Sequence, residues 1–209
     1  APSNTLSLIL TELLETHGSS LDPDAATLVD MALQTVTHMG QLVDDVLHYT
    51  RVVSQEVVEE HVDLNAVLRD VIDDLDALIR SKNAIVVTED LPTVRADGPQ
   101  IRVLLKNLVE NAVKFQAPGK QPHVRVTSSD DTDEQEFAIT VHDNGIGIDE
   151  DKHEQIFTIF KRLNTETKYS GTGLGLAICR RIATNHGSKI CLDSRLGVGS
   201  SFTIGFPPA

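Results

Sequence analysis

Residues Asp143-Asn144-Gly145-Ile146-Gly147-Ile148 form the stretch that decides the fold of this chain. They follow the apolar run Phe137-Ala138-Ile139-Thr140-Val141 and precede an acidic segment that favours a helix. This order predicts a strand that ends in a turn, where two glycines let the backbone approach a ligand closely beside a carboxylate. A lone stretch of this kind is a weak signal, because an aspartate can also simply cap a turn.

Two further stretches make the signal specific. Upstream lies Asn107-Leu108-Val109-Glu110-Asn111-Ala112-Val113-Lys114-Phe115, and downstream lies Gly171-Thr172-Gly173-Leu174-Gly175-Leu176. On a helix, Asn107, Asn111 and Lys114 would share one face, because their spacings are four and three. Together the three stretches supply an acid, amides, a lysine and glycine-rich backbone. These groups suit a nucleotide whose phosphates are bound by a hard metal ion, an ammonium and backbone amides.

The order of these stretches, with Ile156-Phe157-Thr158-Ile159-Phe160 between the two glycine runs, resembles the N, first glycine, F and second glycine boxes of sensor histidine kinases. The resemblance covers nearly the whole chain. It is greatest to the soluble, phytochrome-like kinases, through Leu42-Val43-Asp44-Asp45-Val46-Leu47-His48-Tyr49 and Phe160-Lys161-Arg162-Leu163. It implies an α+β protein with an N-terminal helical hairpin, residues 1–55, that forms a dimeric four-helix bundle. Residues 56–209 would then form a two-layer α/β sandwich with a mixed sheet, the Bergerat-type ATPase fold.

The resemblance also implies what the box residues do. Glu110 and Asn111 would be the catalytic residues, with Glu110 polarising the acceptor histidine and Asn111 ligating Mg²⁺, while Lys114 would contact phosphate. An ordinary exposed helix face is the alternative for Glu110. The buried carboxylate of Asp143 could accept a hydrogen bond from the adenine amine, which favours ATP over GTP, because guanine presents an acceptor there. The other residues expected to contact nucleotide are Asn107, Phe115, Gly145, Gly147, Arg162, Gly171, Thr172, Gly173, Leu174 and Gly175.

The second glycine run and the F box are expected to work as a lid over the nucleotide. The glycines come just before a helical pattern, where unpaired amides and the helix dipole favour an anion. Phe157 and Phe160 are expected to anchor the near end of this lid in the apolar core. Arg162 would reach a phosphate, although an exposed lid arginine is the alternative.

The N-terminal part predicts two helices. In Thr5–Thr16 the apolar residues lie on one helical stripe, and Leu21-Asp22-Pro23-Asp24 opens a second helix. The apolar or small residues of the second helix alternate spacings of four and three, as in coiled-coil packing: Leu28, Ala32, Thr35, Met39, Leu42, Val46, Tyr49 and Val53. A hairpin this short buries little by itself, so we expect a homodimer that completes a four-helix bundle.

The acceptor histidine of such kinases lies in an H box on the first helix. Here the sequence opens with Ala1-Pro2-Ser3-Asn4, which resembles the tail of that box, so the histidine is expected just upstream of Ala1. His38 and His48 fall on the second helix and are interpreted as surface or packing residues. The sequence as given is therefore expected to bind ATP without carrying its own acceptor.

The remaining patterns predict a compact α/β unit. Its expected helices are Asp63–Arg80 with Asp63 as cap, Pro99–Phe115 with a capping box at Asp97 and Gln100, a short one within Asp149–Phe160, and Thr172–His186. Its expected strands are Ala84–Thr88, Leu91–Ala96, Val124–Thr127, Phe137–Val141, Ser188–Ser194 and Ser200–Phe206. The acidic turn Ser128–Glu136 could bind calcium or magnesium, but a polar hairpin tip explains it without a ligand.

Composition bounds the partners. The net charge of −13 argues against binding to a phosphate backbone, so no nucleic-acid partner is expected. The two cysteines, Cys179 and Cys191, have no metal-binding spacing and suit a reduced cytoplasmic protein. No apolar run approaches the roughly 20 residues that cross a bilayer, and no signal-peptide pattern opens the sequence, so no membrane segment is expected in it.

The leading hypothesis is a two-component sensor histidine kinase core. It would use ATP and Mg²⁺ to phosphorylate a histidine and pass the phosphoryl group to an aspartate of a response-regulator receiver domain. One alternative is a non-catalytic phosphotransfer or scaffold protein of the same architecture, which would not need the complete boxes. Another is a different Bergerat-type ATPase, such as a chaperone, a mismatch-repair protein or a type II topoisomerase, which the helical hairpin and the F box argue against.

Overall fold

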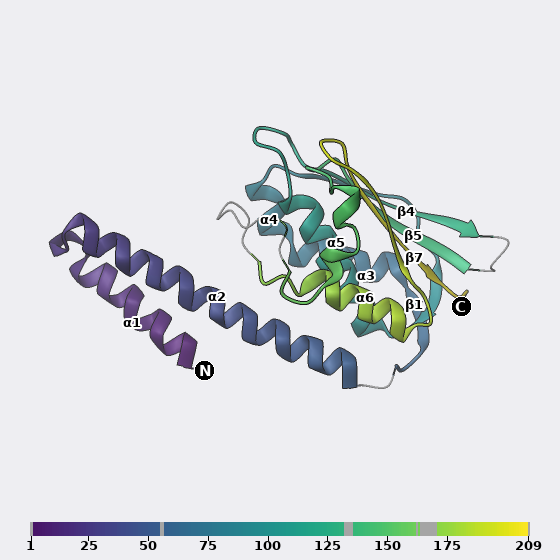
Figure 1. Ribbon diagram of the computed structural model, residues 1–209. Coiled ribbons are helices and arrows are strands. Elements are labelled where there is room, and N and C mark those ends of the chain that lie inside the picture. Colours follow the sequence, from purple (N-terminus) through teal and green to yellow (C-terminus); the bar gives the residue numbers. More distant parts are fainter. Residues whose placement is uncertain (1, 55–56, 132–135, 162, 164–170, 209) are drawn as a thin grey trace. The chain divides into compact units, whose positions relative to one another are not determined.

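The computed structural model describes residues 2–54, 57–131, 136–161, 163 and 171–208 (Figure 1). The chain divides into two compact units. The first unit contains residues 1–51 with 170–172, and the second contains residues 52–169 and 173–209. Within the described part, every helix is too short or too polar to cross a membrane.

The first unit is a hairpin of two long helices, α1 (Pro2–His17) and α2 (Pro23–Ser54). The last turn of α2 belongs to the second unit. The helices run antiparallel and are joined through the short 3-10 helix η1 (Gly18–Ser20) (Figure 1). Asp22 Oδ1 accepts a hydrogen bond from the Ala25 N–H at 2.8 Å, which caps the start of α2. The two predicted helices are thus confirmed, and the first is longer than expected.

The second unit is built on a mixed five-stranded sheet. Its strands, in spatial order, are β2 (Ile85–Thr88), β4 (His123–Asp131), β5 (Glu136–Asp143), β7 (Gly199–Phe206) and β6 (Ile190–Arg195). The β2–β4 pair is parallel and the other pairs are antiparallel, which confirms the mixed sheet. The pairing of β5 with β7 places Asp143 opposite Ser200.

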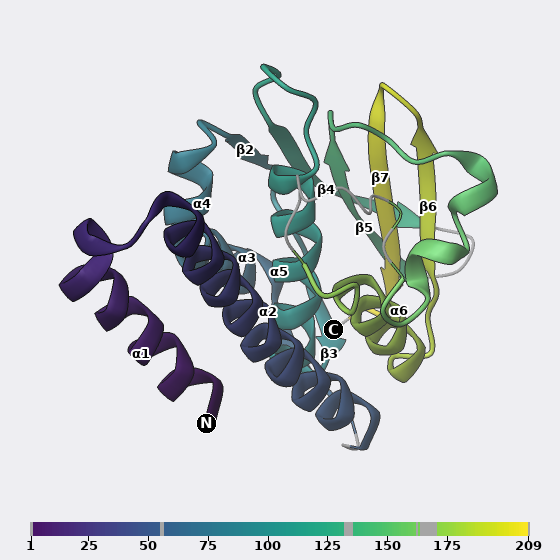
Figure 2. The same ribbon diagram turned by 60° about the vertical axis from the view of Figure 1, so that its left-hand side comes forward.

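Three helices cover one face of this sheet: α3 (Leu64–Asp74), α5 (Gly98–Lys114) and α6 (Gly175–Asn185) (Figure 2). The core between the layers includes Leu104, Leu108, Val113, Val126, Val141, Phe202 and Ile204. Alternate residues of β7 are buried, as expected for a strand with one covered face. Cys179 of α6 is fully buried in this core, whereas Cys191 of β6 is exposed.

The predicted caps of two of these helices are present. Asp63 Oδ1 accepts from the Asn65 N–H at 2.9 Å before α3, and Asp97 Oδ1 accepts from the Gln100 N–H at 3.0 Å before α5. Each cap satisfies an amide that has no partner within its own helix. The capping residues therefore fix where both helices begin.

Several local expectations were wrong. The helix expected over 63–80 is interrupted at the buried Leu75, where α3 ends and α4 (Asp76–Ser81) begins. Before the Asp63 cap, where no strand was expected, residues Glu60–Asp63 form β1, which pairs antiparallel with β3 (Thr93–Ala96) in a separate two-stranded sheet. In place of one short helix after the first glycine run there are two 3-10 turns, η2 (Glu150–Lys152) and η3 (Gln155–Phe157).

Candidate nucleotide-binding site

Asp143 is the last residue of β5, and its carboxylate is held on one side only. Oδ1 accepts hydrogen bonds from the N–H groups of Gly145 (2.7 Å) and Ser200 (3.2 Å). Oδ2 has no hydrogen-bond partner among the residues that the structure describes. Burial raises the pKa of Asp143 to about 6 from its usual 3.8, although the two N–H groups and the charge of Lys120 partly oppose this rise. One carboxylate oxygen is thus fixed by backbone and the other can accept from a ligand.

The first glycine run after Asp143 packs directly against neighbouring backbone. A Cβ at Gly145 would lie 2.4 Å from Phe115 O, and one at Gly147 would lie 2.0 Å from Arg195 O. Gly147 also has φ +67°, which strains any other residue. The Ile146 N–H donates to Phe115 O at 3.0 Å, so the run is tied to the end of α5. Space therefore requires glycine at both positions, and backbone conformation requires it at Gly147 as well.

The turn between β6 and β7, residues 195–199, lies on the other side of the same run. The Gly197 N–H donates to Ile146 O at 2.7 Å, and the Ile148 N–H donates to Ser194 Oγ at 2.9 Å. A Cβ at Gly199 would lie 2.0 Å from Asp143 O. This part of the site was not expected from the sequence. Its signal is the Gly197-Val198-Gly199-Ser200 stretch at the junction of the two last strands.

Helix α5 carries Asn107, Glu110, Asn111 and Lys114, all partly exposed. Asn107 Nδ2 donates to Val103 O at 2.9 Å, and a Cβ at Gly175 would lie 2.5 Å from Asn107 Oδ1. The side chains of Glu110 and Asn111 have no hydrogen bond or ion pair among the described residues. Asn107 therefore faces the start of α6, while the Asn111 amide can still bind a ligand.

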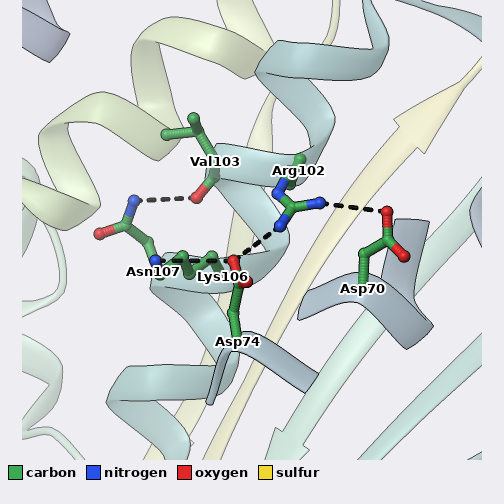
Figure 3. Close-up of polar contacts among 6 residues, drawn as sticks. All are labelled: Asp70, Asp74, Arg102, Val103, Lys106 and Asn107. Atoms are coloured by element: carbon green, nitrogen blue, oxygen red, sulfur yellow. Dashed lines mark hydrogen bonds and ion pairs between the residues drawn. The ribbon is translucent and has the colours of Figure 1, made fainter. Parts of the chain in front are cut away.

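A group of ion pairs ties α5 to α3 on the side away from Asn107 (Figure 3). Arg102 contacts Asp70 at 3.1 Å and Asp74 at 2.7 Å, and Lys106 lies 3.8 Å from Asp74. All four side chains are more than a third exposed, so solvent screens these pairs and each adds little stability.

Lys114 and Phe115 lie at the end of α5, beside the first glycine run. The Lys114 ammonium is 5.8 Å from the centre of the Phe115 ring. Phe115 O accepts from Ile146, as described above, and its N–H donates to Asn111 O at 3.0 Å. Lys114 thus brings a positive charge to the end of the helix that meets the Asp143 loop.

Helix α6 begins at Gly175, within the second glycine run and three residues after the expected start at Thr172. Gly173, Leu174 and Gly175 belong to the unit that contains Asp143, whereas Gly171 and Thr172 are grouped with the helical unit. Leu174 is buried in the core. Gly173 has φ +76°, and its carbonyl accepts from the Phe160 N–H at 3.1 Å. Phe160 of the F box therefore lies beside Gly173 of the second glycine run.

The two F-box phenylalanines are placed differently. Phe157 is buried and makes an edge-to-face contact with Phe202, with ring centres 6.5 Å apart, as expected for a core anchor. Phe160 is 56% exposed, so its expected place in the core was wrong. Its backbone also has a positive φ of +62°, which is uncommon for a residue other than glycine. Arg162 lies outside the described residues.

Comparisons with known proteins identify the family. A sequence profile of the histidine kinase-, DNA gyrase B-, and HSP90-like ATPases matches residues 96–209. The chain belongs to this ATPase family. Phytochrome-like protein Cph1 of Synechocystis sp. is 36% identical over 206 residues, which cover 99% of this chain and 27% of that protein. The chain spans about a quarter of the length of the phytochrome relatives that it matches.

Solved structures agree with this ATPase family. Full-length ShkA in complex with AMPPNP has a TM-score of 0.72 at 28% identity, covering 99% of this chain and 43% of that one. Histidine kinase ThkA in complex with response regulator protein TrrA has a TM-score of 0.68 at 25% identity, covering 100% of this chain and 59% of that one. The resemblance to histidine kinases is thereby confirmed as homology.

Proposed function

We propose that this chain is the dimerisation and ATP-binding core of a two-component histidine kinase. It binds ATP with Mg²⁺, and the γ-phosphate passes to a histidine and then to an aspartate of a response-regulator receiver domain. Membership of the ATPase family, the AMPPNP bound to ShkA and the response regulator bound to ThkA support this assignment. A cytoplasmic location belongs to the proposal, because it supplies both ATP and receiver domains.

The carboxylate of Asp143 carries the proposal. Oδ1 is occupied by two backbone N–H groups, which leaves Oδ2 for the adenine amine. Adenine offers a donor there and guanine an acceptor, so ATP is preferred over GTP. The buried charge also finds in the amine a partner that the ligand-free site lacks.

The test is calorimetry with ATP on the parent chain and on Asp143→Asn. We expect Asp143→Asn to weaken binding by about 10- to 100-fold, because a hydrogen bond to a charged group is lost. Asp193→Asn is the matched control, because Asp193 is an exposed carboxylate of β6 and should leave the affinity unchanged. Equal ATP affinities of the parent and Asp143→Asn would refute the assignment.

Asn111 is proposed to hold the magnesium ion. Its carboxamide suits a hard cation that keeps most of its waters, and the fit is supported by the absence of any described hydrogen bond to that side chain. When bound, the ion would neutralise charge on the phosphates. Asn111→Ala should therefore lose the part of the ATP affinity that EDTA removes from the parent, and binding of ATP without metal should stay the same. A variant whose affinity is still sensitive to EDTA would contradict this role.

Glu110 and Lys114 complete the proposed chemistry. Lys114 would contact phosphate as a point charge, and Glu110 would polarise the acceptor histidine. The test is transfer of label from γ-labelled ATP in a longer chain that includes an H-box histidine. Glu110→Gln should slow labelling and leave the ATP affinity unchanged. Unchanged labelling by Glu110→Gln would show that Glu110 has no catalytic role and is an ordinary residue of the helix surface.

The helical unit is proposed to form a homodimer. It exposes many large apolar side chains, each at least 38% exposed: Leu6, Leu8, Ile9, Leu28, Met31, Met39, Val43, Val46 and Leu47. Exposed apolar side chains in this number are typical of an interaction site, and a second copy would complete a four-helix bundle. Analytical ultracentrifugation at tens of micromolar should show a dimer, and Leu28→Glu with Met39→Glu should shift it to monomer. A monomeric parent would contradict the proposal.

A further inference from the structure

Ser194, the next-to-last residue of β6, is a hydrogen-bond hub beside the candidate site. Its hydroxyl oxygen lies 2.9 Å from each of three atoms: Ile148 N, Gly199 O and Ser200 Oγ. Ile148 ends the first glycine run, and Gly199 and Ser200 begin β7. One side chain therefore links the glycine run to the strand whose backbone holds Asp143.

The directions of these three bonds are fixed by counting protons. A serine hydroxyl has one hydrogen and two lone pairs. The Gly199 carbonyl can only accept, so it takes the Ser194 hydrogen, and the Ile148 N–H donates to the first lone pair. The Ser200 hydroxyl must then donate to the second. Ser194 is thus fully satisfied and fixes the hydroxyl rotor of the buried Ser200.

The linkage reaches Asp143 through Ser200. The Ser200 N–H donates to Asp143 Oδ1 at 3.2 Å, and Ser200 is the residue opposite Asp143 in the β5–β7 pair. Among the described residues, Ser194 is the only one at the β6–β7 turn whose side chain hydrogen-bonds the first glycine run. Gly147 packs against Arg195 O, and Ile146 O accepts from the Gly197 N–H, so these two contacts involve backbone atoms of the turn. They depend on how β6 and the run are held relative to each other.

We propose that Ser194 is a positioning residue for the adenine end of the nucleotide site. Its hydroxyl holds the first glycine run and Ser200 in the arrangement from which the Asp143 carboxylate meets the base. This inference rests on the proposed function for its effect on ATP, but the effect on Asp143 itself is independent of any ligand. Ser194 touches no nucleotide atom in this scheme and acts through Asp143.

The test compares Ser194→Ala and Ser194→Thr with the control Ser201→Ala. Ser201 is the next serine on β7, and its hydroxyl lies 2.8 Å from His142 Nδ1, so the control also removes one serine hydrogen bond. We expect Ser194→Ala to raise the Kd for ATP about tenfold. Ser194→Thr keeps the hydroxyl and should restore the parent Kd, and Ser201→Ala should not change it.

A purely structural hydroxyl would lower stability without changing how Asp143 titrates, so the second readout is that titration. Carboxyl carbon NMR of the ligand-free chains, with Asp143→Asn to assign the resonance, should show a higher midpoint in Ser194→Ala. The reason is that a looser Ser200 N–H stabilises the charged carboxylate less. Ser194→Thr should show the parent midpoint.

The outcomes are separable. A parent chain that fails to bind ATP would remove the proposed function, while the titration of Asp143 would still decide whether Ser194 positions that carboxylate. A Ser194→Ala variant with the parent Kd and the parent midpoint would overturn the inference. If Ser194→Ala does not fold, Ser194→Cys keeps the volume with a much weaker hydrogen-bonding group and is measured in its place.

Discussion

The two glycine runs look alike in sequence but are held in different ways. The first, Gly145–Ile148, is enclosed by backbone on both sides, with Phe115 O and Arg195 O where two Cβ atoms would be. In the second, Gly175 lies against the side chain of Asn107, and Gly173 has backbone neighbours no closer than 3.0 Å to an added Cβ. Backbone cannot move aside without unfolding strands, whereas a side chain can rotate. The part of the candidate site around Asp143 is therefore held by backbone, whereas Gly175 at the start of α6 adjoins a side chain that can adjust.

The largest effect is expected from alanine at Gly147. The new Cβ would meet Arg195 O at 2.0 Å in a left-handed conformation, so Gly147→Ala should cost at least about 3 kcal/mol of unfolding free energy. Gly173→Ala shares the positive φ but not the severe clash, and should cost about 1 to 2 kcal/mol. Urea denaturation measures both. Equal losses of unfolding free energy in the two variants would contradict the view that the first run is enclosed more tightly than the second.

The next effect concerns the charge of the Asp143 carboxylate, which lies beside the first run. Because the pKa of Asp143 is raised to about 6 in the folded chain from 3.8, ionisation opposes folding above pH 6 by about 2 to 3 kcal/mol. This penalty is absent below pH 3.8, where the group is protonated in both states, and grows as the pH rises through the interval. Asp143→Asn should therefore stabilise the ligand-free chain at pH 8, with the gain disappearing near pH 4.

Denaturation of both chains at several pH values measures this gain, with Asp193→Asn as the exposed control. A gain that does not change with pH would mean that Asp143 carries no buried charge. The same substitution is expected to weaken ATP binding, so stability and affinity should move in opposite directions at this one position.

A smaller effect tests the second run. Gly175→Ala should cost about 1 kcal/mol, because its Cβ would lie 2.5 Å from Asn107 Oδ1. In an Asn107→Ala background the same substitution should be neutral or stabilising, since alanine favours a helix over glycine. The double-mutant cycle should thus give a coupling of about 1 to 2 kcal/mol. A coupling near zero would show that the Asn107 contact does not require glycine.

The smallest effect is expected from a change on α3 that touches neither run. Asp74→Ala removes contacts to Arg102 and Lys106, but all three side chains are exposed by more than a third. We expect a loss of about 0 to 1 kcal/mol that shrinks further in 0.5 M salt. A loss of unfolding free energy as large as that of Gly147→Ala would contradict the expected order of these effects.

Features with strong local signals could be predicted from sequence. The Asp97 and Asp63 caps, the strand before Asp143 and the glycines after it all follow from the chemistry of a few adjacent residues. The placement of Asn107 and Asn111 on one face of α5 follows from helical spacing alone. These elements surround the candidate site, so the outline of that site follows from the sequence.

Features set by distant partners could not be predicted. β1 is a polar four-residue strand whose partner, β3, begins 30 residues after it ends, and Ser194 acquires its role only through its register with Ser200. Phe160 is an apolar residue of the kind expected in a core, yet it has a positive φ and is exposed to solvent. In each case the structure of the residue depends on its neighbours in three dimensions rather than on its type.

The placement of the two cysteines offers a practical handle on the folded chain. Burial raises the pKa of the Cys179 thiol far above its usual value, so it stays protonated and unreactive while the core is closed. Cys191 is exposed on β6, three residues from Ser194. A maleimide dye should therefore attach at one position of the native protein, close to the proposed adenine end of the site. Incorporation of a second dye would report each opening of the layer between α6 and the sheet.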